Sequence, residues 1–283
     1  MAARPLQGKL AIVTGSSRGI GAAIAENLAS KGANLVLNYT SPSSADLANA
    51  LATRLSTDYS IRAIPVQADV GTPEGASSLI SSARAHFTNP DTQSFQIDIL
   101  VNNAGIARNA PLPRVTVEDF EATYRVNVLG PLLVTQAAEP YLPRDRSGRI
   151  VNISSVSSQA GFVTQTVYGG SKAALEAMTR TWARELSERA TVNAINPGPV
   201  EGPMYAANPP EFLEDIRGWV MRTPLMRARE GVDPEEVVRD ARESGGRPAY
   251  TKEVAGIVGI LCLEEAGWCT GQVVSANGGM IMQ

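Results

Sequence analysis

The chain has 283 residues, enough for one large α/β domain or two small ones with a substantial core. Its net charge of -3, without any block of basic residues, argues against nucleic acid as the main partner. No apolar run reaches the roughly 18 residues of a membrane-spanning helix. The N-terminal residues also lack the apolar core of a signal peptide, so we expect a cytoplasmic protein.

Only two cysteines occur, Cys262 and Cys269. Their spacing fits neither a common zinc site nor a disulfide framework. We therefore predict that both are packing residues in a reducing compartment, and we predict no metal site. The lone histidine, His86, falls late in a predicted helix without a metal or triad pattern around it, which favours a surface or boundary role.

An apolar strand at residues 9–13 runs directly into the glycine-rich segment Thr14-Gly-Ser-Ser-Arg-Gly-Ile-Gly21, and helical sequence follows it. In this order of strand, loop and helix, glycines let the backbone approach a pyrophosphate, and the helix N-terminus offers free N–H groups. The spacing differs from the G-x-G-x-x-G fingerprint, so a tight turn without a ligand is the alternative. The setting predicts a dinucleotide site.

The strand expected at residues 34–38 ends without an acidic residue, which in many dinucleotide sites binds the ribose 2′-OH. Asn38-Tyr-Thr-Ser41 follows instead, and Arg18 of the glycine segment can reach the same place. Neutral hydroxyls with a guanidinium suit a 2′-phosphate, which predicts NADP(H) rather than NAD(H). A solvated loop charge is the alternative for Arg18.

Strands and helices continue to alternate along the chain, without internal repeats or a shift in composition. Further strands are predicted at 61–66, 97–101, 148–153, 191–195 and 271–275, and helices at 44–55, 73–87, 118–141, 168–189 and 252–263. This order predicts one α/β domain over residues 1–283. We expect a Rossmann-like, doubly wound, mostly parallel sheet of about seven strands, with helices on both faces.

The alternation breaks at about residues 201–250, where prolines and charges surround short helical pieces at 210–221 and 234–243. This segment leaves the carboxyl end of a strand, so we predict a substrate loop or lid. A surface excursion is the alternative.

Polar residues also follow other strands. Asp69 comes just after the strand at 61–66, where ligands bind in open sheets, but it could equally cap the helix that begins near Pro73. Asn102-Asn-Ala-Gly105 suits a tight turn and offers amide groups to a ligand. Asparagine is disfavoured inside a helix, so Asn127 requires exposure, a core hydrogen bond or a function.

Tyr168 and Lys172 are four residues apart, so on a helix they share one face. A nearby cation lowers the pKa of a phenol from about 10 toward the range where it exchanges protons near neutral pH. Ser155, at the end of the strand at 148–153, can fold back toward this face. A Tyr-x-x-x-Lys pair also arises by chance, so its weight as a catalytic pair depends on the motifs that precede it.

Taken together, these motifs resemble the classical short-chain dehydrogenase/reductase family across nearly the whole chain. The residues that carry the resemblance are Thr14-Gly-x3-Gly-Ile-Gly21, Asn102-Asn-Ala-Gly105, Asn127, Ser155, Tyr-x-x-x-Lys172 and Pro197-Gly198. Asn38-Tyr39 and Arg18 are most similar to the β-ketoacyl reductases and fungal ketoreductases, including naphthol-type reductases.

The resemblance implies that Tyr168 donates a proton to a carbonyl oxygen while the nicotinamide delivers a hydride. Lys172 would lower the pKa of Tyr168 and bind the nicotinamide ribose, and Ser155, favoured over Ser154, would hold the carbonyl oxygen. Asn127 would hold a water that links Lys172 to solvent.

The resemblance also implies the cofactor contacts and the assembly. The implied NADP(H)-binding residues are Gly15, Ser17, Arg18, Gly19, Ile20, Gly21, Asn38, Tyr39, Thr40, Ser41, Asp69, Val70, Asn103, Ala104, Gly105, Tyr168, Lys172, Pro197, Gly198 and Val200. A homotetramer is expected, with the helices at 118–141 and 168–189 at one interface. Gly202 departs from the family, which usually has a threonine there to contact the nicotinamide amide.

We therefore predict an NADPH-dependent oxidoreductase that reduces a ketone to a secondary alcohol. Apolar side chains near the 201–250 segment would suit a bulky or aromatic ketone, with a role in the core or at an interface as the alternative: Phe162, Tyr205, Phe212, Trp219 and Met221. Two other functions remain open, an NADP(H)-binding protein with a non-redox or regulatory role and an alcohol dehydrogenase or epimerase of the same family.

Overall fold

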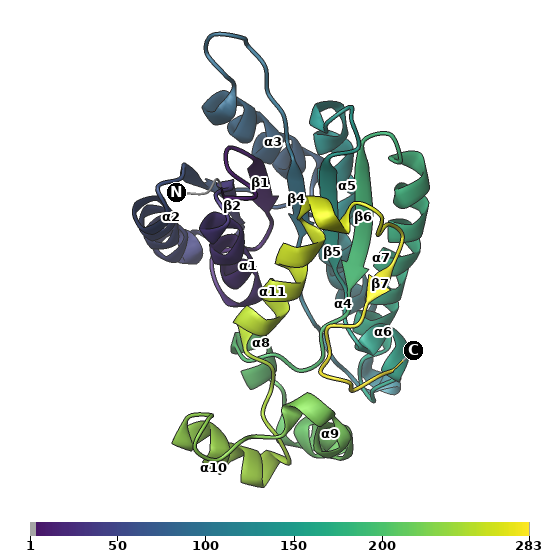
Figure 1. Cartoon of the computed structure of the whole chain (residues 1–283). Helices are drawn as coiled ribbons and strands as arrows, with labels where there is room; N and C mark the ends of the chain where they lie inside the picture. The colour runs from purple at the N-terminus through teal and green to yellow at the C-terminus, as the bar shows by residue number, and fades with distance from the viewer. Residues whose placement is uncertain (1–3, 283) are drawn as a thin grey trace.

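The computed structural model describes residues 4–282, and its centre is a seven-stranded sheet (Figure 1). The strands are β1 (Leu10–Val13), β2 (Asn34–Tyr39), β3 (Ala63–Gln67), β4 (Ile99–Asn102), β5 (Gly148–Ile153), β6 (Ala190–Ile195) and β7 (Val273–Val274). Their order is β3-β2-β1-β4-β5-β6-β7, and every pair of neighbours is parallel. The predicted Rossmann-like, doubly wound fold is confirmed.

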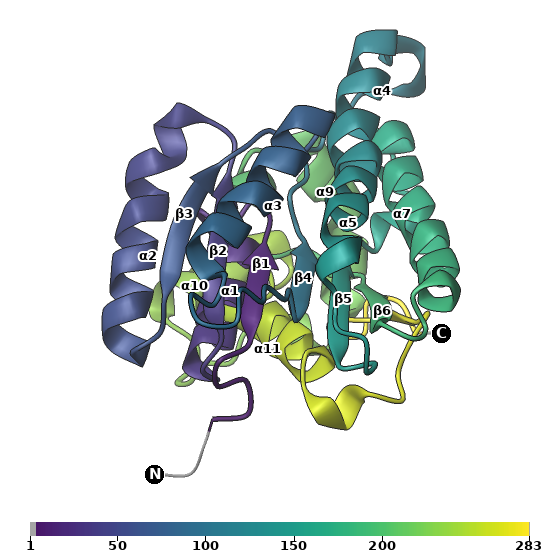
Figure 2. The same ribbon diagram turned by 90° about the horizontal axis from the view of Figure 1, so that it is seen from above.

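Helices cover both faces of this sheet, as the view from above shows (Figure 2). The α-helices are α1 (Gly19–Ser30), α2 (Ala45–Tyr59), α3 (Pro73–Phe87), α4 (Val117–Tyr124), α5 (Gly130–Ala138), α6 (Ser157–Ala160), α7 (Thr166–Glu185), α8 (Pro203–Ala206), α9 (Pro210–Arg222), α10 (Glu235–Ser244) and α11 (Thr251–Leu261). Short helical turns are η1 (Pro42–Ser44), η2 (Leu112–Arg114), η3 (Arg125–Leu129), η4 (Glu139–Tyr141), η5 (Pro224–Met226) and η6 (Glu264–Ala266). Helices α1, α2 and α11 pack on one face, and α3, α5 and α7 pack on the other.

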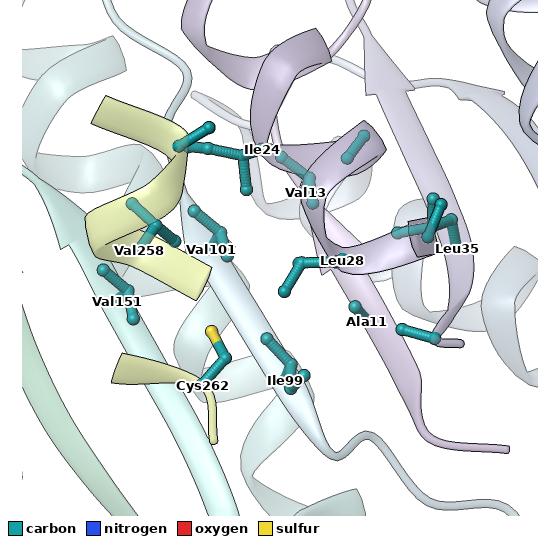
Figure 3. Close-up of a cluster of buried hydrophobic side chains, with 14 of the residues drawn as sticks. Ala11, Val13, Ile24, Leu28, Leu35, Ile99, Val101, Val151, Val258 and Cys262 are labelled. Carbon is teal, nitrogen blue, oxygen red and sulfur yellow. The ribbon is translucent and has the colours of Figure 1, made fainter. Parts of the chain in front are cut away.

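The two faces of the sheet carry separate apolar cores because side chains alternate along each strand. In β1, Ala11 and Val13 face α1 and α11, whereas Leu10 and Ile12 face the opposite helices. Figure 3 shows the first core, where α1 and α11 meet over β1 and β4. Burial on both faces explains why the strands read as continuous apolar runs.

The predicted helix at residues 118–141 is present, but it is not regular throughout. It is divided into α4, the π-helical turn η3, α5 and the 3₁₀ turn η4. The interruption falls at Asn127, whose side chain binds the backbone of a neighbouring loop. Smaller differences are that α2 continues to Tyr59, α7 ends at Glu185, and β7 has only two residues.

The 201–250 segment contains α8, α9, η5 and α10. Figure 1 shows α9 and α10 grouped at the end of the molecule where α6 follows β5. Phe212, Ile216 and Val220 of α9 form a small core with Val156, beside the end of β5, and with Met280 near the C-terminus. The segment therefore lies next to the carboxyl ends of the strands.

Other predictions concern isolated residues. Cys262 is buried in the first core and Cys269 is partly buried, and neither forms a disulfide. His86 is exposed at the end of α3, as expected. Within residues 4–282, no helix is both long and apolar enough to span a membrane, and no cluster of acidic, histidine and cysteine side chains could hold a metal ion.

Candidate active site

The glycine segment lies where the strand order reverses, between β1 and β4, which is where open α/β sheets bind ligands. Gly15 and Gly19 both have positive φ, +61° and +59°. A Cβ on Gly15 would lie 2.9 Å from the Cα of Ala104, whereas a Cβ on Gly19 would meet nothing within 4 Å. Helix α1 begins at Gly19, and no side chain caps its first N–H groups. These features leave an open cradle with free donors, which fits a phosphate group.

The asparagine motif after β4 holds this cradle in place. The Nδ2 of Asn103 donates to the carbonyl oxygens of Thr14 (2.8 Å) and Gly15 (3.0 Å). In return, the backbone N–H groups of Asn103 and Ala104 donate to the Thr14 hydroxyl at 2.9 and 3.0 Å. The Nδ2 of Asn103 is thus committed to the glycine loop.

Asn38, at the end of β2, also holds the loop. Its side chain is fully buried, accepts from the Gly15 N–H at 3.2 Å and donates to the carbonyl of Ala68 at 3.0 Å. The Asn38 side chain has no exposed surface, so it acts on the shape of the glycine loop. Around Asn38, the side chains of Arg18, Thr40 and Ser41 are exposed, and Tyr39 is partly buried.

Asp69 and Val70 follow β3 at the same edge of the sheet. The Asp69 carboxylate is partly exposed, accepts from the Gly71 N–H at 3.0 Å and lies 3.7 Å from Arg125. The alternative that Asp69 caps α3 is wrong, because the hydroxyl of Thr72 accepts from the first turn instead. Val70 is buried.

Asn127 has the core hydrogen bonds that its position in a helix requires. Its Oδ1 accepts from the Ile106 N–H at 2.9 Å, and its Nδ2 donates to the Ile106 carbonyl (2.9 Å) and to the Ser171 hydroxyl (3.0 Å). A Cβ on Gly105 would lie 3.3 Å from this Oδ1 and 3.4 Å from the Nζ of Lys172. Asn127 therefore ties the loop after β4 to α7, beside Lys172.

Ser155, Tyr168 and Lys172 come together after β5. Tyr168 and Lys172 stand one turn apart on α7, and the Nζ of Lys172 lies 5.7 Å from the centre of the Tyr168 ring. The ammonium donates to the carbonyl of Ile153, at the end of β5, at 2.7 Å. The Ser155 hydroxyl donates to Ser157 at 3.0 Å and lies close enough to Tyr168 to influence the pKa of its phenol.

Burial controls the acidity of both titratable groups. It raises the pKa of the Tyr168 phenol, and the hydrogen bond with Ser155 lowers that pKa only in part. Burial also lowers the pKa of Lys172 to about 8, against the opposing charge of Glu176. In this structure, lost hydration is the largest influence on the pKa of Tyr168, and the Lys172 ammonium is directed to a backbone carbonyl.

The loop after β6 lies at the same edge of the sheet as Ser155 and the glycine segment. The N–H of Val156 donates to the carbonyl of Pro197 at 3.0 Å, which holds this loop beside Ser155. Gly198 and Val200 are partly buried in it. Gly202 has a φ of +130°, a conformation that favours glycine, so the threonine usual in the family would be strained at this position.

The sequence analysis missed Glu176, a buried acid one turn beyond Lys172 on α7. Its carboxylate accepts a hydrogen bond from the Ser154 hydroxyl. That hydroxyl is therefore engaged away from Tyr168, which leaves Ser155 as the serine beside the phenol. The available signal was a glutamate on the helix face that Tyr168 and Lys172 share.

Comparisons with known proteins agree with this arrangement. Residues 9–211 match the family model for short chain dehydrogenase. The chain is 54% identical to an L-xylulose reductase of Aspergillus niger, with 98% of each protein covered, and 49% identical to an L-xylo-3-hexulose reductase of Hypocrea jecorina, with 99% of each covered. A blue fluorescent protein from a metagenomic library, solved in complex with NADPH, superposes with a TM-score of 0.82 at 33% identity, over 98% of this chain and 100% of that one. The predicted family is confirmed: the chain belongs to the short-chain dehydrogenase/reductase family of oxidoreductases.

Proposed function

We propose that this protein uses NADPH to reduce the ketone of a small sugar to a secondary alcohol. The observation that carries the proposal is that the open glycine cradle and the Ser155, Tyr168 and Lys172 group lie at the same edge of the sheet. Hydride transfer needs both, because the cofactor and the carbonyl must be held together within reach of one acid.

The residues around the cradle fit a dinucleotide with a 2′-phosphate. The pyrophosphate would bind at the uncapped start of α1, beside Gly19. The exposed Arg18, with the hydroxyls of Thr40 and Ser41, would bind the 2′-phosphate, and no acid occurs in the 38–41 stretch to repel it. When bound, NADPH supplies the hydride. The other proposed contacts are Gly15, Ser17, Ile20, Gly21, Tyr39, Asp69, Val70, Ala104, Gly105, Pro197, Gly198 and Val200, with Asn38 and Asn103 acting through the loop.

Tyr168 is the proposed acid. Because burial raises the pKa of its phenol, Tyr168 stays protonated at neutral pH, which is the form that gives a proton to a carbonyl oxygen. Ser155 would donate a hydrogen bond to the same oxygen as negative charge develops on it. The reverse reaction needs the phenolate, so we expect alcohol oxidation only at alkaline pH.

Lys172 and Asn127 support this acid. The Lys172 ammonium would bind the nicotinamide ribose and pass protons to Tyr168. Asn127 Oδ1 lies beside Lys172 and takes one donor, the Ile106 N–H, so it retains a lone pair for a water on the route to solvent. A hydrogen-bonded chain of this kind would restore the proton that Tyr168 gives up.

The proposed substrate is a polyhydroxylated ketone such as a pentulose or hexulose. Two relatives that match the whole chain carry names that specify ketose reductases. A large aromatic ketone is less well supported, because the aromatic rings expected to bind it pack on one another. The ring of Phe162 meets those of Phe212 and Trp219 edge-on, with centroids 6.3 and 5.8 Å apart.

We further propose that the protein works as a homotetramer in the cytosol. Val117, Phe120 and Leu129, on α4 and η3, are exposed by 74%, 46% and 39%, which supports an interface on these helices next to α7. The free cysteines suit a reducing compartment. Light scattering at micromolar concentration should give a tetramer, and a monomer would contradict the assembly.

The experiment is a panel of ketoses and aromatic ketones, with NADPH and NADH compared for each. We expect NADPH oxidation with ketoses, and Tyr168→Phe should lower kcat by about 10²- to 10⁴-fold while NADPH still binds in a fluorescence titration. Full activity in Tyr168→Phe would refute the assigned acid. Tight NADPH binding without turnover of any carbonyl would favour the non-redox alternative.

A further inference from the structure

A buried carboxylate lies one helical turn beyond Lys172, and the proposed mechanism does not use it. Glu176 on α7 is 5% exposed. Its Oε1 accepts hydrogen bonds from the hydroxyls of Ser154 and Ser158, each at 2.6 Å. A buried charge is costly unless it is paired or hydrogen-bonded, and these two short bonds are of the charge-assisted kind.

The two serines lie on either side of Ser155. Ser154 follows the end of β5, and Ser158 belongs to α6. Ser158 also donates its N–H to the Ser155 carbonyl at 3.0 Å, and its hydroxyl, whose one proton is directed to Glu176, lies 2.8 Å from the same carbonyl oxygen. Glu176 thus fastens both sides of the segment that carries Ser155 to the helix that carries Tyr168 and Lys172.

The charge of Glu176 also acts on Lys172. The groups around the Lys172 side chain are the Tyr168 ring, the Ile153 carbonyl, the Asn127 amide, the Gly105 backbone and Glu176. Of these, Glu176 alone is a carboxylate, and it raises the pKa of Lys172 against the effect of burial.

We propose that Glu176 is a positioning residue for the reduction, which holds Ser155 against α7 through Ser154 and Ser158 and places a negative charge beside the Lys172 ammonium. The inference rests on the proposed roles of Ser155 and Lys172. It adds a second hydrogen-bonded link between α7 and the end of β5, besides the bond from Lys172 to the Ile153 carbonyl.

Substitutions can separate the two effects, because both serines donate to the same oxygen. Glu176→Gln keeps an amide oxygen for them and removes only the charge. We expect the alkaline fall of kcat/KM for ketose reduction to move to lower pH by about one unit, the lower end of the effect of a charge a few ångströms away. A profile that coincides with that of the native enzyme would overturn the electrostatic half of the proposal.

Ser158→Ala tests the positioning half, since it removes one of the two bonds and keeps the charge. We expect kcat to fall about tenfold, an effect of one lost hydrogen bond on the placement of Ser155, with the pH profile and NADPH binding unchanged. A native kcat in Ser158→Ala would overturn the positioning half. Glu176→Ala should combine both effects, and thermal unfolding of each variant identifies any that fail to fold.

Two controls make the outcomes distinguishable. Glu185→Gln removes an exposed charge from the same helix and should leave kcat and the pH profile as in the native enzyme. Tyr168→Phe is measured in parallel. Loss of activity there with native behaviour of the Glu176 and Ser158 variants overturns the positioning role alone, whereas retained activity in Tyr168→Phe overturns the proposed function.

Discussion

The cofactor cradle and the 201–250 segment lie at the same edge of the sheet, but they are held in different ways. In the cradle, polar side chains at the ends of three neighbouring strands form hydrogen bonds with backbone groups of the glycine loop or of the residues next to it. Thr14, Asn38 and Asn103 belong to the ends of β1, β2 and β4, and each bonds to that loop or to the residues next to it. The shape of the cradle is therefore set by the buried centre of the sheet.

The 201–250 segment packs through a small core that it shares with Val156 and Met280, and it makes few hydrogen bonds to the rest of the described chain. Val200 pairs with Ala249 in an isolated bridge, Glu201 accepts from Thr251, and Arg247 binds Glu253. Local opening of such a segment costs less than opening the sheet. We therefore expect substitutions within this segment to disturb the glycine loop little.

The largest effect is expected in the cradle, from Gly15→Val. The φ of +61° disfavours a branched side chain, and its Cβ would press against the backbone of Ala104. We expect a loss of about 3 kcal/mol in the free energy of unfolding, measured by urea denaturation, together with loss of NADPH binding. Gly218→Ala, in open space on α9, is the control and should be neutral or slightly stabilising. If Gly15→Val were as stable as the native protein, the buried sheet would not set the shape of the cradle as we infer.

A change in the segment core should act mainly on the substrate. Phe212→Ala removes the buried ring that packs against Phe162, at a cost of about 2.5 kcal/mol, below the usual range for a phenylalanine because the core is small. We expect a higher KM for the ketose, faster proteolysis within residues 201–250, and NADPH affinity close to that of the native enzyme. An equal loss of NADPH affinity would show that the two regions are not independent.

The pH dependence of reduction tests the group that lies between the two regions. Because burial lowers the pKa of Lys172 to about 8, the ammonium is present below that pH and is lost above it. We expect kcat/KM to be highest below pH 8 and to fall about tenfold between pH 7 and pH 9, which corresponds to about 1.4 kcal/mol. A rate that increases over this range would contradict a role for the ammonium form.

The smallest effect is expected from Gly202→Thr, which restores the residue usual in the family. The φ of +130° makes a threonine strained there, although no atom lies within 4 Å of the new Cβ. We expect a loss of about 1 kcal/mol in thermal unfolding, and a change in KM rather than a gain in kcat. A clear gain in kcat would mean that the start of α8 adjusts to the threonine.

Local patterns in the sequence determined most of the fold and pointed to the proposed catalytic residues. Alternating apolar strands and amphipathic helices predict the doubly wound sheet, because each element buries one face or both. The four-residue spacing of Tyr168 and Lys172 places them on one face of α7, since a helix has 3.6 residues per turn. Neither conclusion needs contacts between distant parts of the chain.

Only the tertiary structure decided how the polar residues are used. Asn103 binds Gly15 across 88 positions, and Glu176 binds Ser154 across 22, so no local pattern could assign their partners. The π turn at Asn127 and the raised pKa of Tyr168 likewise depend on groups brought from other elements and on the water they exclude. Hydration and hydrogen-bond partners are properties of the packed molecule, because they depend on which surfaces meet.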